Sequence, residues 1–139
     1  MRFVSFEVNG KQAYGLWKDE KTWLQVPTEF QARHSDLRSV IAAGQLDELG
    51  RVTEAAGITV SNSKARLMPV IPNPGKILCV GLNYKSHVAE TKRSDSEYPS
   101  LFVRFADSLC AHDAALPRPK ETKRFDFEGE LAVIIGKEG

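Results

Sequence analysis

The sequence has little of several features that would assign a protein class at once. It has only two cysteines, Cys79 and Cys110, in 139 residues, too few for the disulfide scaffold of a small secreted domain. No apolar run approaches the roughly 20 residues that cross a bilayer. Lys and Arg number 19 against 18 Asp and Glu, so there is no charge excess that would attract nucleic acid or an anionic membrane. We therefore expect a cytoplasmic protein whose cysteines are buried free thiols.

What the sequence does have is the composition of a globular protein, with 42% hydrophobic and 27% charged residues. One segment differs in texture: residues 68–75 hold three prolines and a glycine. Proline fixes φ and removes a hydrogen-bond donor, so neither a helix nor an inner strand continues there. We expect a linker over residues 67–75, between a small α+β domain of residues 1–66 and a second domain of residues 76–139.

The front part reads as an antiparallel meander. Apolar side chains alternate along residues 4–8, and Asn9-Gly10 follows, a strong hairpin signal because both central residues of a type I′ turn need φ above zero. Further strands are expected over residues 13–17 and 22–26.

Two helices are expected next. Ser35 is a candidate N-cap for a short helix with an apolar stripe, and Gly44 fits its end. A second helix is expected over residues 46–56, although Gly50 weakens it by roughly 1 kcal/mol relative to Ala.

The second part is expected to hold strands over residues 77–80 and 101–105, a short helix over residues 86–91, and a last strand over residues 128–135. That last strand is apolar on both faces between Leu131 and Ile135, so it needs a partner strand on each side. The sequence ends four residues later. We therefore expect an α+β, mainly β protein whose second domain is incomplete.

His87 and Glu90 are the first candidates for chemistry. They are three residues apart, so a helix places them on one face. A carboxylate on one imidazole nitrogen fixes the tautomer and leaves the other nitrogen to take a proton from water. The alternative is a surface His–Glu pair on a solvated helix.

Three acidic residues are the second candidates. The two-residue period of a strand places Asp126, Glu128 and Glu130 on one face. Burying unpaired carboxylates is expensive, so a cation is a natural compensator. Oxygen ligands suit Mg²⁺, Mn²⁺ or Ca²⁺ better than zinc. The alternative is an exposed edge strand whose acids face water.

Arg104 is a weaker candidate. It lies in an expected strand and its guanidinium can bind a substrate carboxylate through two hydrogen bonds. It is equally compatible with a solvated, outward-facing position.

Taken in order, these stretches resemble the fumarylacetoacetate hydrolase family. The segments that carry the resemblance are residues 76–84, His87, Glu90, residues 99–102, Ser108, Leu109 and residues 126–137. It covers about residues 67–139 well, while the front part is similar, less specifically, to the variable amino-terminal domain of longer members. The ordered pair of a G-L-N-Y-x-x-H-x-x-E segment and an E-x-E-L-A-V-I-I-G segment makes it specific.

The resemblance implies a mixed, largely β fold and a homodimer. It implies that Glu128 and Glu130 bind the metal, Mg²⁺ or else Mn²⁺ or Ca²⁺, and that His87 and Glu90 activate water. The family's third metal ligand is an aspartate beyond the last residue of this sequence. Asp126 is not a ligand in the family pattern.

The resemblance also assigns substrate contacts. Tyr84 belongs to the matching segment and is expected to bind substrate. Arg104 stands where many members carry a lysine, which keeps the charge but changes the geometry of the donor group.

The reaction that the resemblance implies is hydrolysis of a carbon–carbon bond in a 1,3-diketo acid of the acylpyruvate type. Decarboxylation and isomerisation of hydroxymuconate-type acids are alternatives within the family, and we expect the segment between Glu90 and Pro99 to decide among them. A hypothesis of another class is a truncated, non-catalytic fragment. On that hypothesis the 139-residue chain alone is weakly active or inactive.

Overall fold

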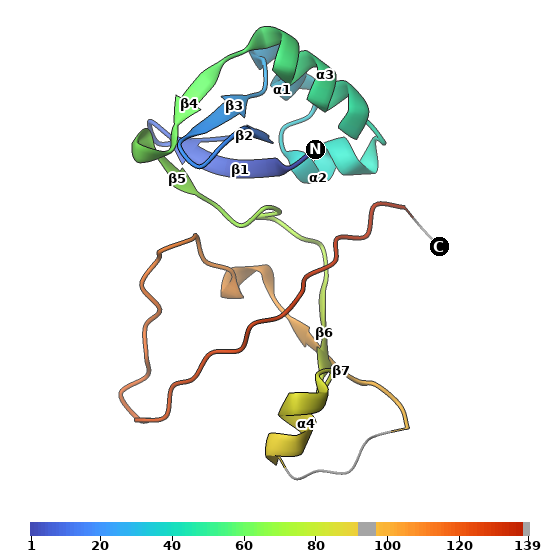
Figure 1. Cartoon of the computed structure of the whole chain (residues 1–139), viewed down its shortest axis with the longest axis vertical. Helices are drawn as coiled ribbons and strands as arrows, with labels where there is room; N and C mark the ends of the chain where they lie inside the picture. Colours follow the sequence, from blue (N-terminus) through green and yellow to red (C-terminus); the bar gives the residue numbers. More distant parts are fainter. Residues whose placement is uncertain (92–96, 138–139) are drawn as a thin grey trace. The chain divides into compact units, whose positions relative to one another are not determined.

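The computed structural model describes residues 1–91 and 97–137, which form two compact units. One unit comprises Met1–Ile71 and Cys110–Gly139, and the other comprises Pro72–Leu109. Both contain antiparallel sheet together with helices (Figure 1). The expected α+β, mainly β class is therefore confirmed.

The first unit contains a five-stranded antiparallel sheet with the strand order β4-β3-β2-β1-β5. Its strands are β1 (Phe3–Val8), β2 (Lys11–Trp17), β3 (Thr22–Gln25), β4 (Thr59–Ser61) and β5 (Ala65–Leu67). The hairpin expected at Asn9-Gly10 is confirmed: Val8 pairs with Lys11, and the two turn residues have φ values of 51° and 72°. The sequence did not predict β4 or β5.

The sheet curls on itself. Strands β4 and β5 are its two outer strands, yet only the 3₁₀ turn η1 (Asn62–Lys64) separates them along the chain. Figure 1 shows them meeting at this turn. At Gly15 a Cβ atom would lie 1.9 Å from the Leu24 carbonyl oxygen, so glycine is needed where β2 and β3 approach so closely.

Each face of the sheet carries its own buried cluster. Ala13 belongs to one cluster and its neighbour Tyr14 to the other, and successive strand residues point to opposite faces. The first cluster comprises Val4, Phe6, Ala13, Trp23 and Val60. Its aromatic rings pack closely, with 5.2 Å between the ring centroids of Phe6 and Trp23.

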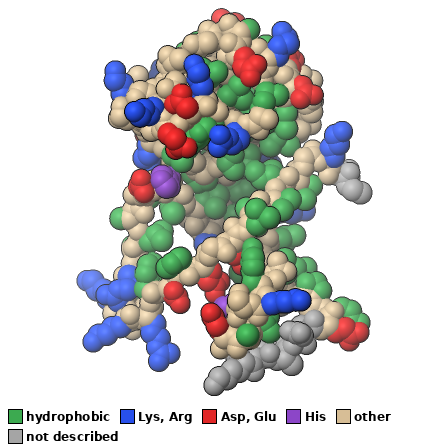
Figure 2. Space-filling model, viewed as in Figure 1, with side chains coloured by type: hydrophobic (Ala, Val, Ile, Leu, Met, Phe, Trp, Pro, Cys, Tyr) green, Lys and Arg blue, Asp and Glu red, His purple; other side chains and the backbone are tan. Residues whose placement is uncertain are grey.

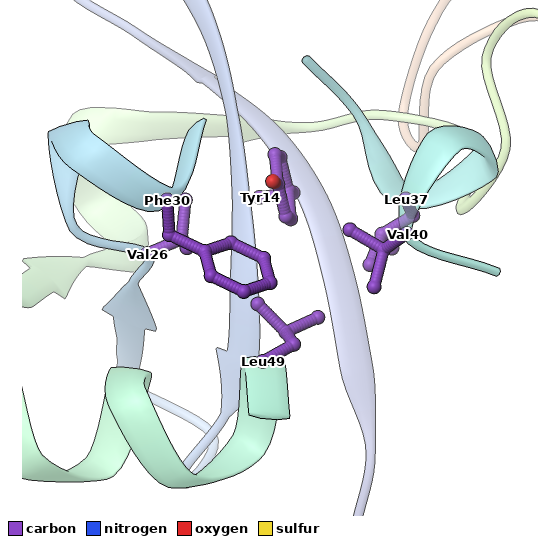
Figure 3. Packing of buried hydrophobic residues seen from close by; sticks show 6 residues of the cluster. All are labelled: Tyr14, Val26, Phe30, Leu37, Val40 and Leu49. Atoms are coloured by element: carbon purple, nitrogen blue, oxygen red, sulfur yellow. The ribbon is translucent and has the colours of Figure 1, made fainter. Parts of the chain in front are cut away.

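Helices cover the other face. They are α1 (Thr28–Arg33), α2 (Leu37–Ala42) and α3 (Leu46–Ala56). They supply most of the second cluster, which Figure 3 shows from close by: Tyr14, Val26, Phe30, Leu37, Val40 and Leu49. The Tyr14 hydroxyl donates to the backbone carbonyl of His34 just after α1. The sequence did not predict α1.

The ends of the expected helices are largely as predicted. Helix α3 has the predicted bounds, and Gly44, with φ of 67°, follows α2 closely. The N-cap of α2 is Asp36 and not Ser35, because the Asp36 carboxylate accepts from the Ser39 N–H while the Ser39 hydroxyl reaches the Asp36 N–H. This reciprocal capping box satisfies two donors that Ser35 would leave open.

Two local contacts explain the glycine inside α3 and the path of the chain after β5. Gly50 in α3 leaves room for the Met1 side chain, since a Cβ there would lie 2.2 Å from the Met1 sulfur. The start of the proline-rich segment is fastened to β1: the Met68 N–H donates to the Ser5 carbonyl over 2.9 Å, and the buried Ser5 hydroxyl donates to the Val70 carbonyl over 2.7 Å.

The second unit is built on a two-stranded ribbon. Strand β6 (Ile77–Gly81) pairs antiparallel with β7 (Ser100–Arg104), helix α4 (Lys85–Thr91) follows β6, and the 3₁₀ turn η2 (Ala106–Ser108) follows β7. The two strands and the helix agree with the predicted ones to within one residue at each end, whereas η2 was not predicted.

The strand expected over residues 128–135 is wrong. This segment forms neither helix nor strand, and its side chains are exposed, Leu131 by 83% and Ile135 by 78%. A strand exists only through ladder hydrogen bonds to a neighbour, and no strand of the described residues pairs with this segment.

Two further expectations concern the whole chain. Both cysteines are free, but Cys79 is half-buried and Cys110 is exposed, so the expected burial is wrong for Cys110. Within residues 1–91 and 97–137, no helix is long and apolar enough to cross a membrane.

Candidate active site

Helix α4 carries the candidate base, and it is joined directly to the ribbon. Strand β6 ends at Gly81, three residues follow, and α4 begins at Lys85. The Val88 N–H donates to the Tyr84 carbonyl over 3.1 Å, so Tyr84 is tied to the first turn of the helix. Because the connection is so short, the backbone conformation of residues 82–84 determines the direction in which α4 leaves β6.

His87 and Glu90 face each other on α4, as their spacing predicts. The His87 Nδ1 atom lies 3.8 Å from a Glu90 carboxylate oxygen, and the side chains are 37% and 79% exposed. This distance is longer than a hydrogen bond, but catalytic hydrogen bonds are often long before substrate binds. The carboxylate therefore lies on the Nδ1 side of the imidazole ring and not on the Nε2 side.

The ribbon separates Arg104 from this pair. Arg104 pairs with Ile77 at the far end of the ribbon, whereas Ser100 pairs with Gly81 at the end next to α4. Four residues of strand correspond to roughly 13 Å. The β7 residue nearest to the start of the β6–α4 connection is therefore Ser100, which sequence reasoning missed because the ribbon register has no sequence signal.

Glu128 and Glu130 lie in the other unit, within residues 124–136, which form neither helix nor strand and are called the extended segment below. Both are exposed. Asp126 is engaged locally, since its carboxylate accepts from the Phe127 N–H over 2.8 Å. Figure 2 shows many hydrophobic side chains at the surface, and those of this segment include Phe127, 89% exposed, and Val133, 75% exposed.

The donor chemistry of Glu128 and Glu130 fits a hard divalent cation as part of a ligand set. They are two carboxylates in alternate positions of an extended chain, and carboxylate oxygens are ligands that Mg²⁺ and Mn²⁺ prefer. Among residues 1–91 and 97–137, no three His, Cys, Asp or Glu side chains are grouped closely enough to hold a metal ion. Glu128 and Glu130 therefore fit a divalent cation as two of its ligands.

The segment expected to choose among the family reactions lies between Glu90 and Pro99. Residues 92–96 of it are outside the part of the chain that the structure describes.

Comparison with known proteins assigns the second part of the chain. Residues 76–139 match the family described as fumarylacetoacetate (FAA) hydrolase C-terminal. Over 110 residues, or 75% of its length, the chain is 33% identical to the fumarylacetoacetate hydrolase domain-containing protein 2 homolog of Dictyostelium discoideum. This comparison covers 35% of that relative.

A second comparison extends over the whole chain. The chain is 29% identical to an uncharacterized protein of Staphylococcus aureus strain USA300, and the alignment covers 100% of the chain and 52% of that relative. The same values hold for a protein of strain N315. The chain thus spans 35% to 52% of the length of these curated relatives.

Proposed function

The chain belongs to the fumarylacetoacetate hydrolase family, and from this premise we propose that it serves the metal-dependent hydrolysis of a carbon–carbon bond in a 1,3-diketo acid of the acylpyruvate type. The observation that carries the proposal is the pair on α4: Glu90 faces Nδ1 of His87, and we assign the role of base to Nε2. Membership of the family supports hydrolase or lyase chemistry in general. The particular substrate and reaction are our proposal.

His87 acts on water in this proposal. Its Nε2 takes a proton from a water molecule, and the resulting hydroxide attacks the carbonyl remote from the keto acid. The carbon–carbon bond breaks, its electron pair goes to the pyruvate side as an enolate, and that enolate takes up a proton. The products are a carboxylic acid and a 2-keto acid. The Glu90 carboxylate stabilises the imidazolium that forms in the first step.

Glu128 and Glu130 would hold the cation. When bound, a divalent ion supplies Lewis-acid stabilisation of negative charge on the substrate oxygens. Arg104 offers a guanidinium for a substrate carboxylate, and Tyr84 offers a phenol hydroxyl beside α4. These assignments rest on the resemblance, as does the proposal of a homodimer.

The test is a turnover assay of the protein with acetylpyruvate in the presence of Mg²⁺ or Mn²⁺. We expect His87→Ala to lower kcat roughly 10²–10⁴-fold, the range for loss of a general base, and Glu90→Gln to lower it by less. Turnover that survives His87→Ala unchanged would exclude the proposed base.

The chain offers a matched control for this assay. His112 is 66% exposed, and its Nε2 lies 3.4 Å from the Asp113 carboxylate. It therefore resembles the His87–Glu90 pair in composition but lies outside α4, and His112→Ala should leave kcat unchanged. Oxaloacetate and a hydroxymuconate-type acid assayed in parallel distinguish hydrolysis from decarboxylation and isomerisation.

A further inference from the structure

Leu82 has an unusual backbone conformation. Its φ is 55°, in the left-handed region. Among the described residues other than glycine, Asn9 and Asp113 also have positive φ, but Asn and Asp tolerate that region through local hydrogen bonds. A bulky residue there is uncommon and strained.

The position of this residue makes the strain notable. Leu82 directly follows the last residue of β6 and begins the three-residue connection to α4. The preceding Gly81, which could adopt positive φ without strain, is not in the left-handed region. The chain therefore makes its left-handed turn at a leucine although a glycine is adjacent.

We propose that Leu82 is a positioning residue whose left-handed backbone sets the direction in which α4 leaves the ribbon, and so where His87 lies. The inference rests on the proposed function of His87. Strained conformations persist where the surrounding structure enforces them, and they cluster at functional sites.

Both ends of the connection between β6 and α4 are held by hydrogen bonds, so its course depends on the backbone between them. Gly81 is fixed by its pairing with Ser100 at the end of the ribbon, and the first turn of α4 is fixed by the Tyr84–Val88 hydrogen bond. Among the described residues between these two anchors, Leu82 is the one residue with positive φ. A change of φ from the left-handed to the extended region is a rotation of more than roughly 100°, and His87 lies five residues further along the chain.

Substitutions at Leu82 separate backbone conformation from side-chain packing. Leu82→Ile keeps the volume, but its branched Cβ strongly disfavours positive φ. Leu82→Asn and Leu82→Gly change the side chain and accept positive φ. The matched control is Leu78→Ile in β6, where the residue is extended, paired with Val103 and 65% exposed.

Two readouts follow these variants. In NMR spectra, Leu82→Ile should shift the amide resonances of residues 85–90, because α4 moves relative to the ribbon, while the His87–Glu90 proximity within the helix is kept. The Asn, Gly and Leu78→Ile variants should leave these resonances unchanged. In the turnover assay, Leu82→Ile should lower kcat roughly tenfold with less than about a twofold change in KM, because misplacing a catalytic group acts on the chemical step. The Asn and Gly variants should stay within about threefold of the wild type.

The opposite pattern would overturn the proposal. If Leu82→Asn and Leu82→Gly lose as much kcat as Leu82→Ile, the side chain matters and the backbone turn does not. If Leu82→Ile fails to fold, Leu82→Asn decides alone, since retained α4 resonances support the proposal and lost ones contradict it. If the wild type turns over no keto acid, the proposed function fails, yet the α4 resonances still test the positioning role.

Discussion

Residues 1–71 and residues 72–137 differ in how far they bury their side chains. Among the described residues, every buried hydrophobic side chain except Ala111 lies in residues 1–71. In residues 72–137, many large hydrophobic side chains are exposed to solvent, including Leu101 by 62% and Phe105 by 77%. Residues 76–139, which match the family domain, thus lie in the region where fewer hydrophobic side chains are buried.

The difference teaches that the packed core and the candidate catalytic residues lie in different parts of this chain. The front sheet and its helices supply the packed clusters, whereas the candidate catalytic and metal-binding side chains lie beyond them. Substitutions in residues 1–71 should therefore change the free energy of unfolding, and those at the candidate site should change turnover with little effect on unfolding.

The largest effect is expected from Leu49→Ala. Leu49 is fully buried in the helix-side cluster, so truncation removes apolar burial and leaves a cavity, lowering the free energy of unfolding by about 2–5 kcal/mol. Leu131→Ala is the matched substitution at a side chain that is 83% exposed, and it should stay within about 0.5 kcal/mol. Urea unfolding measures both. Equal losses would break the contrast between the regions.

Tyr14 should make the front region sensitive to alkaline pH. Burial, with the Asp36 carboxylate adding to it and the Arg33 guanidinium opposing it, raises the pKa of Tyr14 from 10.0 to about 12. The raised pKa favours folding below pH 10, and this contribution is lost as the pH rises from 10 to 12.

Tyr14→Phe tests this dependence. The variant loses the hydroxyl's hydrogen bond to His34, so it should be less stable at pH 8 by about 1 kcal/mol. The difference from the wild type should shrink or reverse between pH 10 and 12, as measured by urea unfolding at each pH. A difference that is constant with pH would contradict the assigned titration.

A smaller effect is expected from Gly15→Ala. The new Cβ would lie 1.9 Å from the Leu24 carbonyl oxygen, which is backbone and yields little. We expect a loss of about 1–3 kcal/mol, the range for overpacking. Gly129→Ala is the control, because nothing lies within 4 Å of its Cβ position, and it should be neutral in the same unfolding measurement.

The smallest effect is expected from Asp36→Ala. It removes the N-cap of α2 and should lower the free energy of unfolding by about 1 kcal/mol. Asp126→Ala removes a comparable contact to a neighbouring N–H, but in the extended segment, and should change unfolding by less. A larger loss from Asp126→Ala would show that this segment contributes to stability.

The sequence predicted elements with local signals and missed those that depend on distant partners. The Asn9-Gly10 turn and the bounds of α3 follow from neighbouring residues. Strands β4 and β5 have three residues each and exist through pairing with β3 and β1, which lie far away along the chain. The apolar run of residues 131–135 has a strand composition, but composition does not supply a hydrogen-bonding neighbour.

The candidate site divides in the same way. The spacing of His87 and Glu90 predicted their contact, because helix geometry is local. The register of β6 and β7 is a long-range property, and only the structure reveals that Ser100, rather than Arg104, pairs with the end of β6. The domain boundaries and the metal role of Glu128 and Glu130 stay predictions.

The metal dependence of the proposed reaction depends on cation binding by Glu128 and Glu130, and titration with paramagnetic Mn²⁺ followed by NMR tests this directly. We expect substoichiometric Mn²⁺ to broaden the amide signals of residues 127–131 before those of the acidic residues of α3. Glu128→Gln with Glu130→Gln should remove this preference. Broadening that is uniform along the chain, or unchanged in the double variant, would contradict the proposed metal site.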